Sequence, residues 1–365
     1  MQERYIDTPG QLQDLCEQIR HSPWLALDTE FVREKTYTAN LCLVQLCNGE
    51  LAACIDPLAF RDLSPLLEIL INPQMVKIFH AGHQDLEIFY QLWGQLPKPL
   101  FDTQIAATLL GYGEQIGYAN LVQQLLGREL EKGHTRTDWS RRPLHAAQLR
   151  YALDDVIYLG EIYLTIESQI RERQRESWLQ EELKKLSDPI TYVNSPDQMW
   201  KRIRGQRHLK GAQRVVLQAL AAWREDEAQR ANRPRRWILK DAVLLELARR
   251  QPTDITRLES INGLESGTVQ HWGSRLIQLI ANSKTLPKTQ WPLNDVRPPQ
   301  LSQEQGAQMD RLLDHLHQTA EDEAIPPTLL TNRRDLERLV AGERELPILR
   351  GWRRTLVGEK LLEML

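Results

Sequence analysis

A pair of carboxylates stands at the end of a short apolar run, at a spacing that would let both act on one substrate. The run covers residues 24–28 and is typical of a buried strand; Asp28 and Glu30 lie two residues apart at its end. Residues with that spacing point to the same face of a strand, so both carboxylates project together. Two carboxylates held close repel each other unless a cation lies between them. A lone acid there more often caps the next element, so the pair indicates a metal only if further ligands join it.

Three more candidate residues follow, each on a predicted helix. Asp85 stands in the first turn of a helix after the predicted strand 75–79, where the helix dipole favours an acid even without a function. Tyr151 and Asp155 are four residues apart in a long predicted helix and therefore share one face. Asp154 is rotated away by one residue, and we expect it in solvent. Taken alone, Tyr151 is explained equally well by core packing, so the evidence for a functional site lies in the order and spacing of the whole set.

The chemistry that suits four carboxylates is metal-assisted hydrolysis of a phosphodiester. The attacking water must lose a proton and charge on the leaving oxygen must be neutralised, and two divalent cations about 3.5–4 Å apart do both. Hard Mg²⁺ or Mn²⁺ prefers carboxylate oxygens. Zinc is not favoured, because the cysteines form no Cys-x-x-Cys pair and no histidine pair stands near them at ligand spacing. We expect four buried, reduced thiols: Cys16, Cys42, Cys47 and Cys54.

In order and spacing, these segments resemble the three exonuclease motifs of the DEDD superfamily. The matching segments are residues 27–31, 80–86 and 151–155. The tyrosine four residues before the last aspartate resembles the branch that uses Tyr where its sister branch uses His. Residues 99–105 and 136–144 narrow the resemblance to the ribonuclease D family, and the likeness extends over almost the whole chain.

The resemblance implies an activity and a role for each candidate residue. It implies a 3′→5′ exoribonuclease that releases nucleoside 5′-monophosphates from RNA with a free 3′ end, with tRNA precursors as the expected substrate. Asp28, Glu30, Asp85 and Asp155 would bind two divalent cations, Mg²⁺ or Mn²⁺, with Asp28 bridging them. Tyr151 would orient the attacking water, and an ordinary pKa near 10 would keep it neutral at pH 7.

The strands and helices predicted for the first half of the chain must position these residues. They predict an α/β domain over residues 1–195, with a mixed sheet and flanking helices, and the resemblance implies that this sheet is ribonuclease H-like. Asp102 is expected to cap a helix, and His80 and His83 to pack or form hydrogen bonds in preference to binding metal. The predicted helices cover residues 11–19, 62–71, 83–93, 103–112, 117–127 and 145–173, and the strands residues 24–28, 41–47, 51–56, 75–79 and a short one ending at Phe101, with a hairpin turn at Asn48-Gly49.

Strand signals vanish after about residue 175, and two all-α helical modules are predicted, over residues 205–290 and 300–365. They share three features in the same order, which indicates a diverged duplication. The shared features are Glu-Asp-Glu-Ala at 225 and at 321, an apolar pair at 238 and at 329, and Trp-x-x-x-Leu at 272 and at 352. This half resembles the helicase-and-RNase-D C-terminal (HRDC) domain, present twice.

Charge is distributed unevenly along the chain. The formal net charge is −3, yet residues 200–300 contain 19 Lys and Arg against 9 Asp and Glu. Such a segment suits a polyanion, although a solvated helical surface would look the same. Trp237 in this segment is expected in the core. The candidate substrate contacts are Arg233, Arg235 and Arg236 in the basic segment, and Trp139, Arg141 and Arg142 in the loop before the last catalytic helix, where Trp139 could equally well pin the loop.

Two other functions stay open at the level of sequence. One is a DNA 3′→5′ exonuclease of the proofreading kind, because the metal site would be the same. The other is an inactive nucleic-acid-binding adaptor, against which the complete set of acids and Tyr151 argues. Since no apolar stretch reaches 18 residues and no secretory signal is recognisable, we expect a cytoplasmic protein with no membrane partner. The pattern does not indicate an oligomeric state.

Overall fold

The structure is a computed structural model of the 365-residue chain, and it describes residues 1–130, 137–292 and 301–365. The chain divides into two units. Unit 1 comprises Met1–Val32, Leu41–Tyr192 and Pro298–Leu365, and unit 2 comprises Arg33–Asn40 and Val193–Arg297. Among the described helices, none combines the length and the apolar character that a membrane crossing requires.

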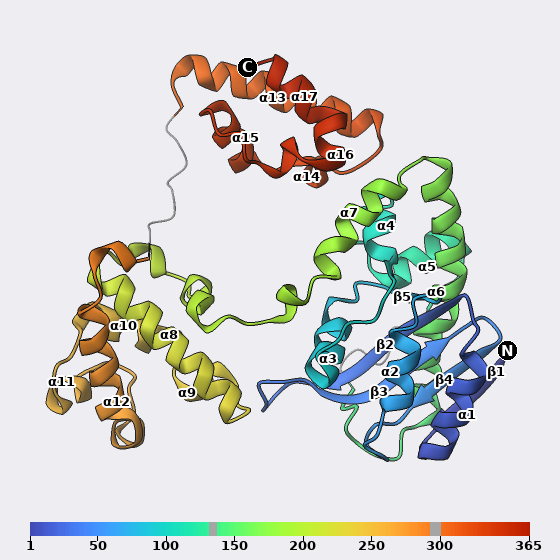
Figure 1. The fold of residues 1–365 in the computed structure, drawn as a ribbon, viewed down its shortest axis with the longest axis horizontal. Coiled ribbons are helices and arrows are strands. Elements are labelled where there is room, and N and C mark those ends of the chain that lie inside the picture. Colours follow the sequence, from blue (N-terminus) through green and yellow to red (C-terminus); the bar gives the residue numbers. More distant parts are fainter. Residues whose placement is uncertain (131–136, 293–300) are drawn as a thin grey trace. The chain divides into compact units, whose positions relative to one another are not determined.

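Unit 1 is built on one six-stranded mixed sheet, which confirms the predicted sheet class (Figure 1). The spatial order is β1-β4-β3-β2-β5-β6; β3 and β4 are antiparallel, and the pairs β1/β4, β2/β5 and β5/β6 are parallel. The predicted turn joins β3 to β4, with Gly49 at a φ of 94°. The hydrophobic pattern missed the partly exposed edge strand β1. The strands are β1 Gln2–Ile6, β2 Trp24–Val32, β3 Asn40–Cys47, β4 Leu51–Ile55, β5 Val76–Phe79 and β6 Leu100–Asp102.

Helices cover both faces of this sheet (Figure 1). On one face Phe79 of β5 contacts Phe89 of α3, with ring centroids 6.3 Å apart. On the other face α6 packs on β2, and a Cβ added at Gly160 would lie 2.4 Å from the Trp24 ring, so only glycine permits this approach. The helices of this part are α1 Pro9–Ile19, α2 Ser64–Leu70, α3 His83–Trp93, α4 Thr103–Leu109, α5 Tyr118–Leu126, α6 Ala146–Glu172 and α7 Glu176–Leu186, with a 3₁₀ turn at Pro189–Tyr192.

The register of β2 against β5 fixes where a site can form. Ala26 lies opposite Ile78, and both strands run in the same direction. Asp28 follows two residues later on β2, and the segment that leads into α3 follows β5 directly. The carboxyl-terminal half of β2 therefore lies beside the carboxyl end of β5, the end of parallel strands at which open α/β sheets commonly bind ligands.

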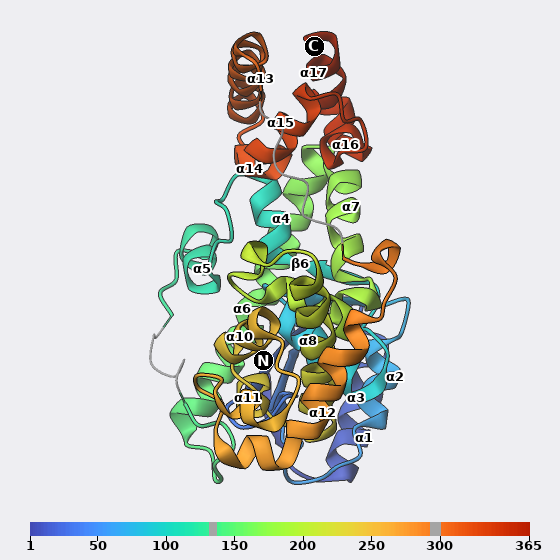
Figure 2. The same ribbon diagram turned by 90° about the vertical axis from the view of Figure 1, so that its left-hand side faces the viewer.

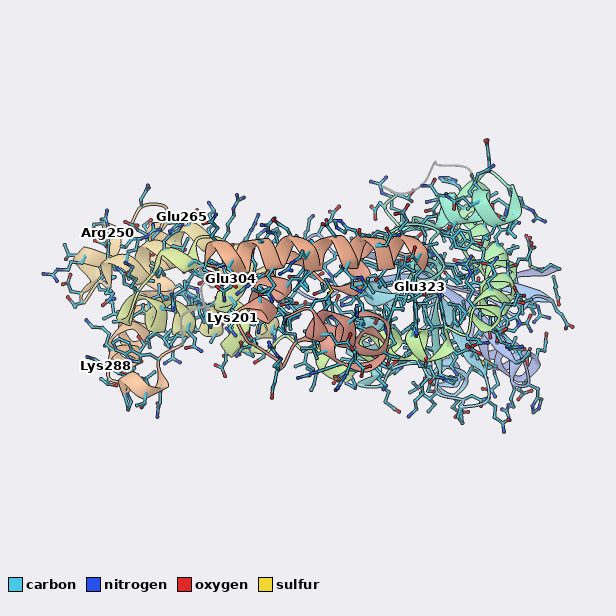
Figure 3. The ribbon with its side chains drawn as sticks, turned by 90° about the horizontal axis from the view of Figure 1, so that it is seen from above. Lys201, Arg250, Glu265, Lys288, Glu304 and Glu323 are labelled. Carbon is cyan, nitrogen blue, oxygen red and sulfur yellow. The ribbon has the colours of Figure 1, made fainter. Side chains whose placement is uncertain are left out.

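The C-terminal segment of unit 1 is helical and packs against α7 (Figures 1 and 2). Trp352 stacks on Trp178 of α7 with ring centroids 4.3 Å apart, and Arg353 pairs with Glu182 at 2.5 Å. In Figure 3, Glu304 and Glu323 label the two ends of the long helix α13. Glu323 forms an ion pair with Arg175 at 2.7 Å. The elements are α13 Gln303–Asp322, α14 Pro327–Leu330, α15 Arg333–Val340, a 3₁₀ turn Pro347–Leu349, α16 Gly351–Arg353, a π turn Arg354–Gly358 and α17 Glu359–Glu363.

The described residues of unit 2 form helices around a separate apolar core. Glu225 of α8 is buried in it at 1% exposure, and Arg235 and the hydroxyl of Tyr37 both hydrogen-bond to its carboxylate. The segment Arg33–Asn40, which contains Tyr37, thus belongs to this unit. The elements are 3₁₀ turns at Pro196–Arg202, Gln206–His208 and Lys288–Gln290, and helices α8 Ala212–Arg230, α9 Arg235–Ile238, α10 Asp241–Arg250, α11 Ile255–Glu259 and α12 Ser266–Lys284.

Candidate active site

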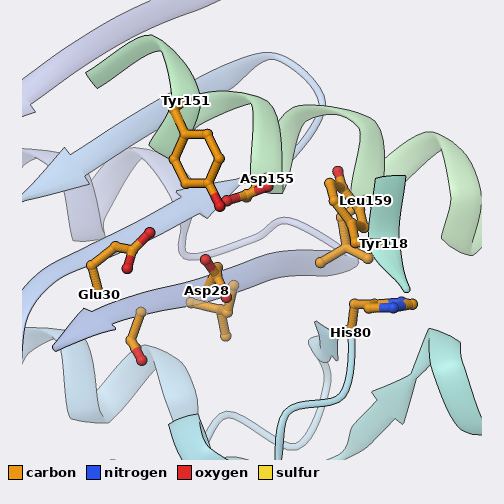
Figure 4. Close-up of a pocket in the computed structure, with 9 residues that line it drawn as sticks. Asp28, Glu30, His80, Tyr118, Tyr151, Asp155 and Leu159 are labelled. Atoms are coloured by element: carbon orange, nitrogen blue, oxygen red, sulfur yellow. The ribbon is translucent and has the colours of Figure 1, made fainter. Parts of the chain in front are cut away.

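Three of the predicted acids come together beside the carboxyl end of β5, along which the longer strand β2 continues to Val32. Asp28 and Glu30 project from β2 and Asp155 projects from α6, and each offers a carboxylate oxygen within 4.8 Å of the others (Figure 4). They line a pocket of about 260 Å³, which Tyr151 also lines. The i, i+2 spacing on the strand and the i, i+4 spacing on the helix therefore place these side chains as predicted.

Burial and mutual repulsion oppose ionisation of the carboxyl groups in this pocket. Burial, together with Asp85, Asp155 and Glu30, raises the pKa of Asp28 well above its ordinary value. Burial and the neighbouring acids raise the pKa of Glu30 to about 8, and burial and Asp154 raise that of Asp155 to about 7. No lysine or arginine is among the described residues that line the pocket. A set of close carboxylate oxygens without a cationic side chain fits hard divalent cations such as Mg²⁺ or Mn²⁺.

Asp85, the fourth acid, approaches from the other side of β2. It lies buried in the first turn of α3, and its Oδ1 accepts a hydrogen bond of 2.5 Å from Thr29 Oγ1. Thr29 stands between the two acids of β2, so its side chain points to the opposite face of the strand. Burial raises the pKa of Asp85 to about 6. The three-acid cluster does not include Asp85, but its charge acts on Asp28. Nothing in the sequence pattern singled out Thr29.

Asp102 holds the segment that leads into α3. It caps α4 as predicted, accepting hydrogen bonds from the backbone N–H groups of Gln104 at 2.9 Å and Ile105 at 3.1 Å. Its second oxygen accepts from the N–H of Gly82 at 2.9 Å. A Cβ at Gly82 would lie 2.5 Å from that of Phe79, so glycine is required for this path. One buried carboxylate therefore ties the start of α4 to the loop before Asp85.

Tyr151 donates a hydrogen bond to Asp155, and burial raises the pKa of its hydroxyl above 10. Trp139 lies beside it, with ring centroids 6.2 Å apart, and is only 3% exposed. We predicted that Trp139 stacks on substrate, with pinning of the loop as the alternative. Since both faces of a nearly buried indole are occupied by protein, the structure favours the alternative: Trp139 supports Tyr151.

Two arginines predicted to contact substrate are engaged within the protein. Arg142 donates to both oxygens of Asp56, at 2.6 and 2.7 Å, and Asp56 is 2% exposed. Arg235 is held in the same way by the buried carboxylate of Glu225. Both guanidinium groups therefore anchor local structure through a buried carboxylate. Arg141, by contrast, is 85% exposed and pairs only with Asp138 in the described part of the chain. Arg136, at the start of the motif 136–144, lies outside the described residues.

The remaining candidates lie at the surface of unit 2. Arg233 and Arg236 are exposed, as a phosphate contact requires. Trp237 is 59% exposed, so the prediction that it belongs to the core is wrong. It lies on α9, a helix of four residues, which is too short for hydrophobic periodicity to indicate which face is buried.

The pocket has a second half that carries no acids. His80, Tyr118 and Leu159 line it on the side away from Glu30 (Figure 4). His80 is hydrogen-bonded through both ring nitrogens, to Thr103 Oγ1 at 2.9 Å and the carbonyl of Ile116 at 3.0 Å, which agrees with the prediction that it packs or forms hydrogen bonds. The Tyr118 hydroxyl donates to the carbonyl of Asp154 at 2.9 Å, and its ring lies 5.5 Å from that of His80. This half presents ring faces and no unpaired polar group from His80 or Tyr118.

Known proteins resemble this chain over its whole length. Residues 4–171 match the family described as 3'-5' exonuclease, and residues 213–280 match the HRDC domain. Ribonuclease D of Sphingobium indicum is 42% identical over 357 residues, which cover 97% of this chain and 92% of that protein. Ribonuclease D of Zymomonas mobilis is 41% identical, covering 99% and 93%. The crystal structure of Escherichia coli RNase D, "an exoribonuclease involved in structured RNA processing", has a TM-score of 0.87 at 32% identity and covers 100% of this chain and 98% of that chain.

The pairing of Arg142 with the buried Asp56 leads to a prediction about stability. Arg142→Gln leaves the buried carboxylate of Asp56 without its charged partner, which should lower the free energy of unfolding by about 3 kcal/mol. Arg141→Gln changes an exposed neighbour and should stay within about 0.5 kcal/mol of wild type. Urea unfolding followed by circular dichroism measures both variants. Equal stability of the two would mean that the Arg142–Asp56 pair does not anchor the loop.

Repulsion among the carboxylates gives a second prediction. Asp28→Asn removes one charge from the cluster, so in EDTA the variant should be more stable than wild type by on the order of 1 kcal/mol. The same variant should bind Mn²⁺ roughly 100-fold more weakly, since loss of a supporting residue alone costs about 10- to 100-fold. Urea unfolding and calorimetric Mn²⁺ titration are the measurements. Asp62→Asn is the control, because Asp62 is an exposed acid that does not line the pocket and accepts a hydrogen bond from the N–H of Ser64 at 2.9 Å, so it should leave Mn²⁺ binding unchanged. If Asp28→Asn binds Mn²⁺ as tightly as wild type, these acids do not form the metal site.

Proposed function

The chain belongs to the ribonuclease D family and is a 3′→5′ exoribonuclease, and from that premise we propose that Asp28, Glu30, Asp85 and Asp155 hold two divalent cations at its active site. The observation that carries the proposal is the cluster of three carboxylates within 4.8 Å, with a fourth acid acting on Asp28. The DNA-proofreading and inactive-adaptor alternatives are set aside, because relatives named ribonuclease D match nearly the full chain.

Each protein group has a defined task in this proposal. Divalent cations bound there would acidify the attacking water and neutralise charge on the leaving oxygen. Asp28 lies in one cluster with Glu30 of its own strand and Asp155 of α6, and we assign it the role of a ligand that both cations would share. Tyr151 stays protonated at neutral pH, so it would hold the water by hydrogen bonding and would not act as a base. We therefore place the chain in the tyrosine branch of the DEDD superfamily, with Mg²⁺ or Mn²⁺ as the cations.

The two halves of the pocket fit the two halves of a nucleotide. The acidic half would face the scissile phosphate through the cations. The half lined by His80, Tyr118 and Leu159 would receive the 3′-terminal base on ring faces and an apolar side chain. His80 and Tyr118 already make their hydrogen bonds within the protein. We infer that the pocket accepts the base by stacking and does not read its identity, which suits an enzyme that removes nucleotides in succession.

The helical parts would handle the rest of the substrate. The HRDC domain and the basic segment 200–300 support RNA binding by unit 2. We propose that the C-terminal segment is a second, diverged HRDC domain, because the order of helices is the same: a long helix with a Glu-Asp-Glu motif at or near its C-terminal end, a helix of four residues, then a third helix. The proposed substrates are RNA precursors with unprocessed 3′ ends, among them those of tRNA.

The function is tested on 5′-labelled RNA that carries a stem and a single-stranded 3′ extension. We expect a ladder of products shortened by one nucleotide at a time with Mg²⁺ or Mn²⁺, and none in EDTA. The DNA analogue should be degraded more slowly. Asp155→Asn should form no ladder while its circular dichroism spectrum is unchanged. A ladder that persists in EDTA would rule out the metal site.

The role of Tyr151 makes a graded prediction. Tyr151→Phe keeps the ring against Trp139 but removes the hydroxyl, so kcat should fall by roughly 10²- to 10⁴-fold, as for other groups that orient a reacting water. Mn²⁺ affinity should stay within a few-fold of wild type, in contrast to Asp28→Asn. Single-turnover cleavage and calorimetric titration separate the two effects. If Tyr151→Phe loses Mn²⁺ as severely as Asp28→Asn, Tyr151 belongs to the metal site.

Stacking without base recognition also predicts a rate pattern. Four short RNAs that differ only in the 3′-terminal base should have kcat/KM values within about fivefold, since a bidentate hydrogen bond to a base discriminates by ~1–3 kcal/mol. Tyr118→Ala should raise KM for all four alike, whereas Tyr118→Phe, which keeps the ring face, should not. A preference well above tenfold for one base would mean that a polar group in this half of the pocket reads the base.

A further inference from the structure

Among the described residues of unit 2, one large aromatic side chain is mostly exposed to solvent. Trp237 is 59% exposed, while Trp200 and Trp223 of the same unit are 3% and 6% exposed and lie in its core. An indole buries 150–250 Å² when it is covered, so an uncovered one is a ready contact surface. The exposure therefore needs an explanation other than core packing.

The backbone around Trp237 is anchored on both sides. Arg235, two residues before it, is hydrogen-bonded to both oxygens of the buried Glu225 and lies 4.9 Å over the Tyr37 ring. Leu239, two residues after it, has its carbonyl bonded to Arg224 at 2.8 Å. The indole is thus displayed by a fixed scaffold, and its position outside the core does not come from a loosely held loop.

The cations beside Trp237 have no side-chain partner in the described part of the chain. Arg233, Arg236 and Lys240 are exposed, and within the described residues their side chains make no ion pair or hydrogen bond. Other arginines of unit 2 are neutralised by a neighbouring acid: Arg230 by Glu227, Arg250 by Glu246 and Arg257 by Asp254. The excess positive charge of the basic segment is therefore available around the exposed indole.

We propose that Trp237 is a stacking platform for a base of single-stranded RNA, with Arg233, Arg236 and Lys240 contacting the flanking phosphates. An aromatic face next to unpaired cations matches a nucleotide, whose base stacks and whose phosphate carries charge. A single strand is required, because a duplex keeps its base faces covered by stacking. The inference deepens the proposed RNA-binding role of unit 2 and rests on it.

Stacking and phosphate contact respond differently to salt, which permits a sharp test. The binding assay uses the full chain made inactive by Asp155→Asn and a fluorescein-labelled 12-nucleotide single-stranded RNA, with fluorescence anisotropy over a series of salt concentrations. Trp237→Ala should weaken binding roughly 5- to 150-fold, as for loss of one stacked base, without changing the slope of log K against log salt. Arg236→Gln should reduce that slope by about 0.7, the value for one phosphate on a single strand.

Matched controls lie in the same unit. Ile255→Ala removes an apolar side chain that is 41% exposed, and Arg257→Gln removes an exposed arginine paired with Asp254, so both should bind like wild type. Trp237→Phe should recover most of the affinity, because it retains an aromatic face. Trp237→Ala should bind duplex RNA as wild type does, because no base face is available there.

Two outcomes overturn the proposal. Wild-type affinity of Trp237→Ala for the single strand would show that the indole is not an RNA contact. A flattened salt slope in Trp237→Ala, like that of Arg236→Gln, would show that the substitution only displaces the cations. The cleavage assay on 5′-labelled RNA is run in parallel with the active wild-type chain. Failure of that cleavage assay would contradict the proposed function, whereas the binding series tests only the stacking role of Trp237.

Discussion

Mutual repulsion of the carboxylates of Asp28, Glu30 and Asp155 is the constraint on which the rest of unit 1 depends. At about 5 Å and an effective dielectric constant of about 20, each ionised pair repels by about 3–4 kcal/mol. The sheet and α6 hold the three groups together, and Gly160 lets that helix approach β2 closely enough. A cluster kept under repulsion is an indication of function, because packing alone would favour neutral side chains here.

The contacts that support the site join residues far apart in the sequence, whereas each motif lies within a few consecutive residues. The acids of β2 and the Tyr151–Asp155 pair were predictable because a strand and a helix fix which neighbours share a face. Thr29 and Asp85 are 56 residues apart, and Asp102 and Gly82 are 20 apart. No local rule brings such residues together, since the sheet order β1-β4-β3-β2-β5-β6 decides it. The class of the sheet followed from the pattern of elements, whereas its order and the edge strand β1 did not.

The arginines show why charge alone could not separate structural from binding residues. In sequence, Arg142 and Arg235 look like the arginines next to them. In the structure each pairs with an acid that is at most 2% exposed, Asp56 for Arg142 and Glu225 for Arg235. A buried acid requires a partner, so it binds one guanidinium, while the adjacent arginine stays at the surface. In the run from Arg233 to Trp237, Arg235 therefore anchors the segment that presents Arg236. The same anchoring accounts for the exposed indole, which hydrophobicity alone assigns to the core.

The acidic site also limits where affinity for RNA can arise. Carboxylates raised in pKa by burial and by one another cannot attract a polyanion until cations are bound, and even then the charge is largely balanced locally. The pocket itself offers the terminal nucleotide ring faces and an apolar side chain, which bind bases of any identity weakly. The remaining affinity must come from groups outside the pocket that carry positive charge without a protein partner. The basic segment of unit 2 has such groups, so in the proposed function chemistry and affinity are divided between separate parts of the chain, and a change in salt should act on binding far more than on the chemical step.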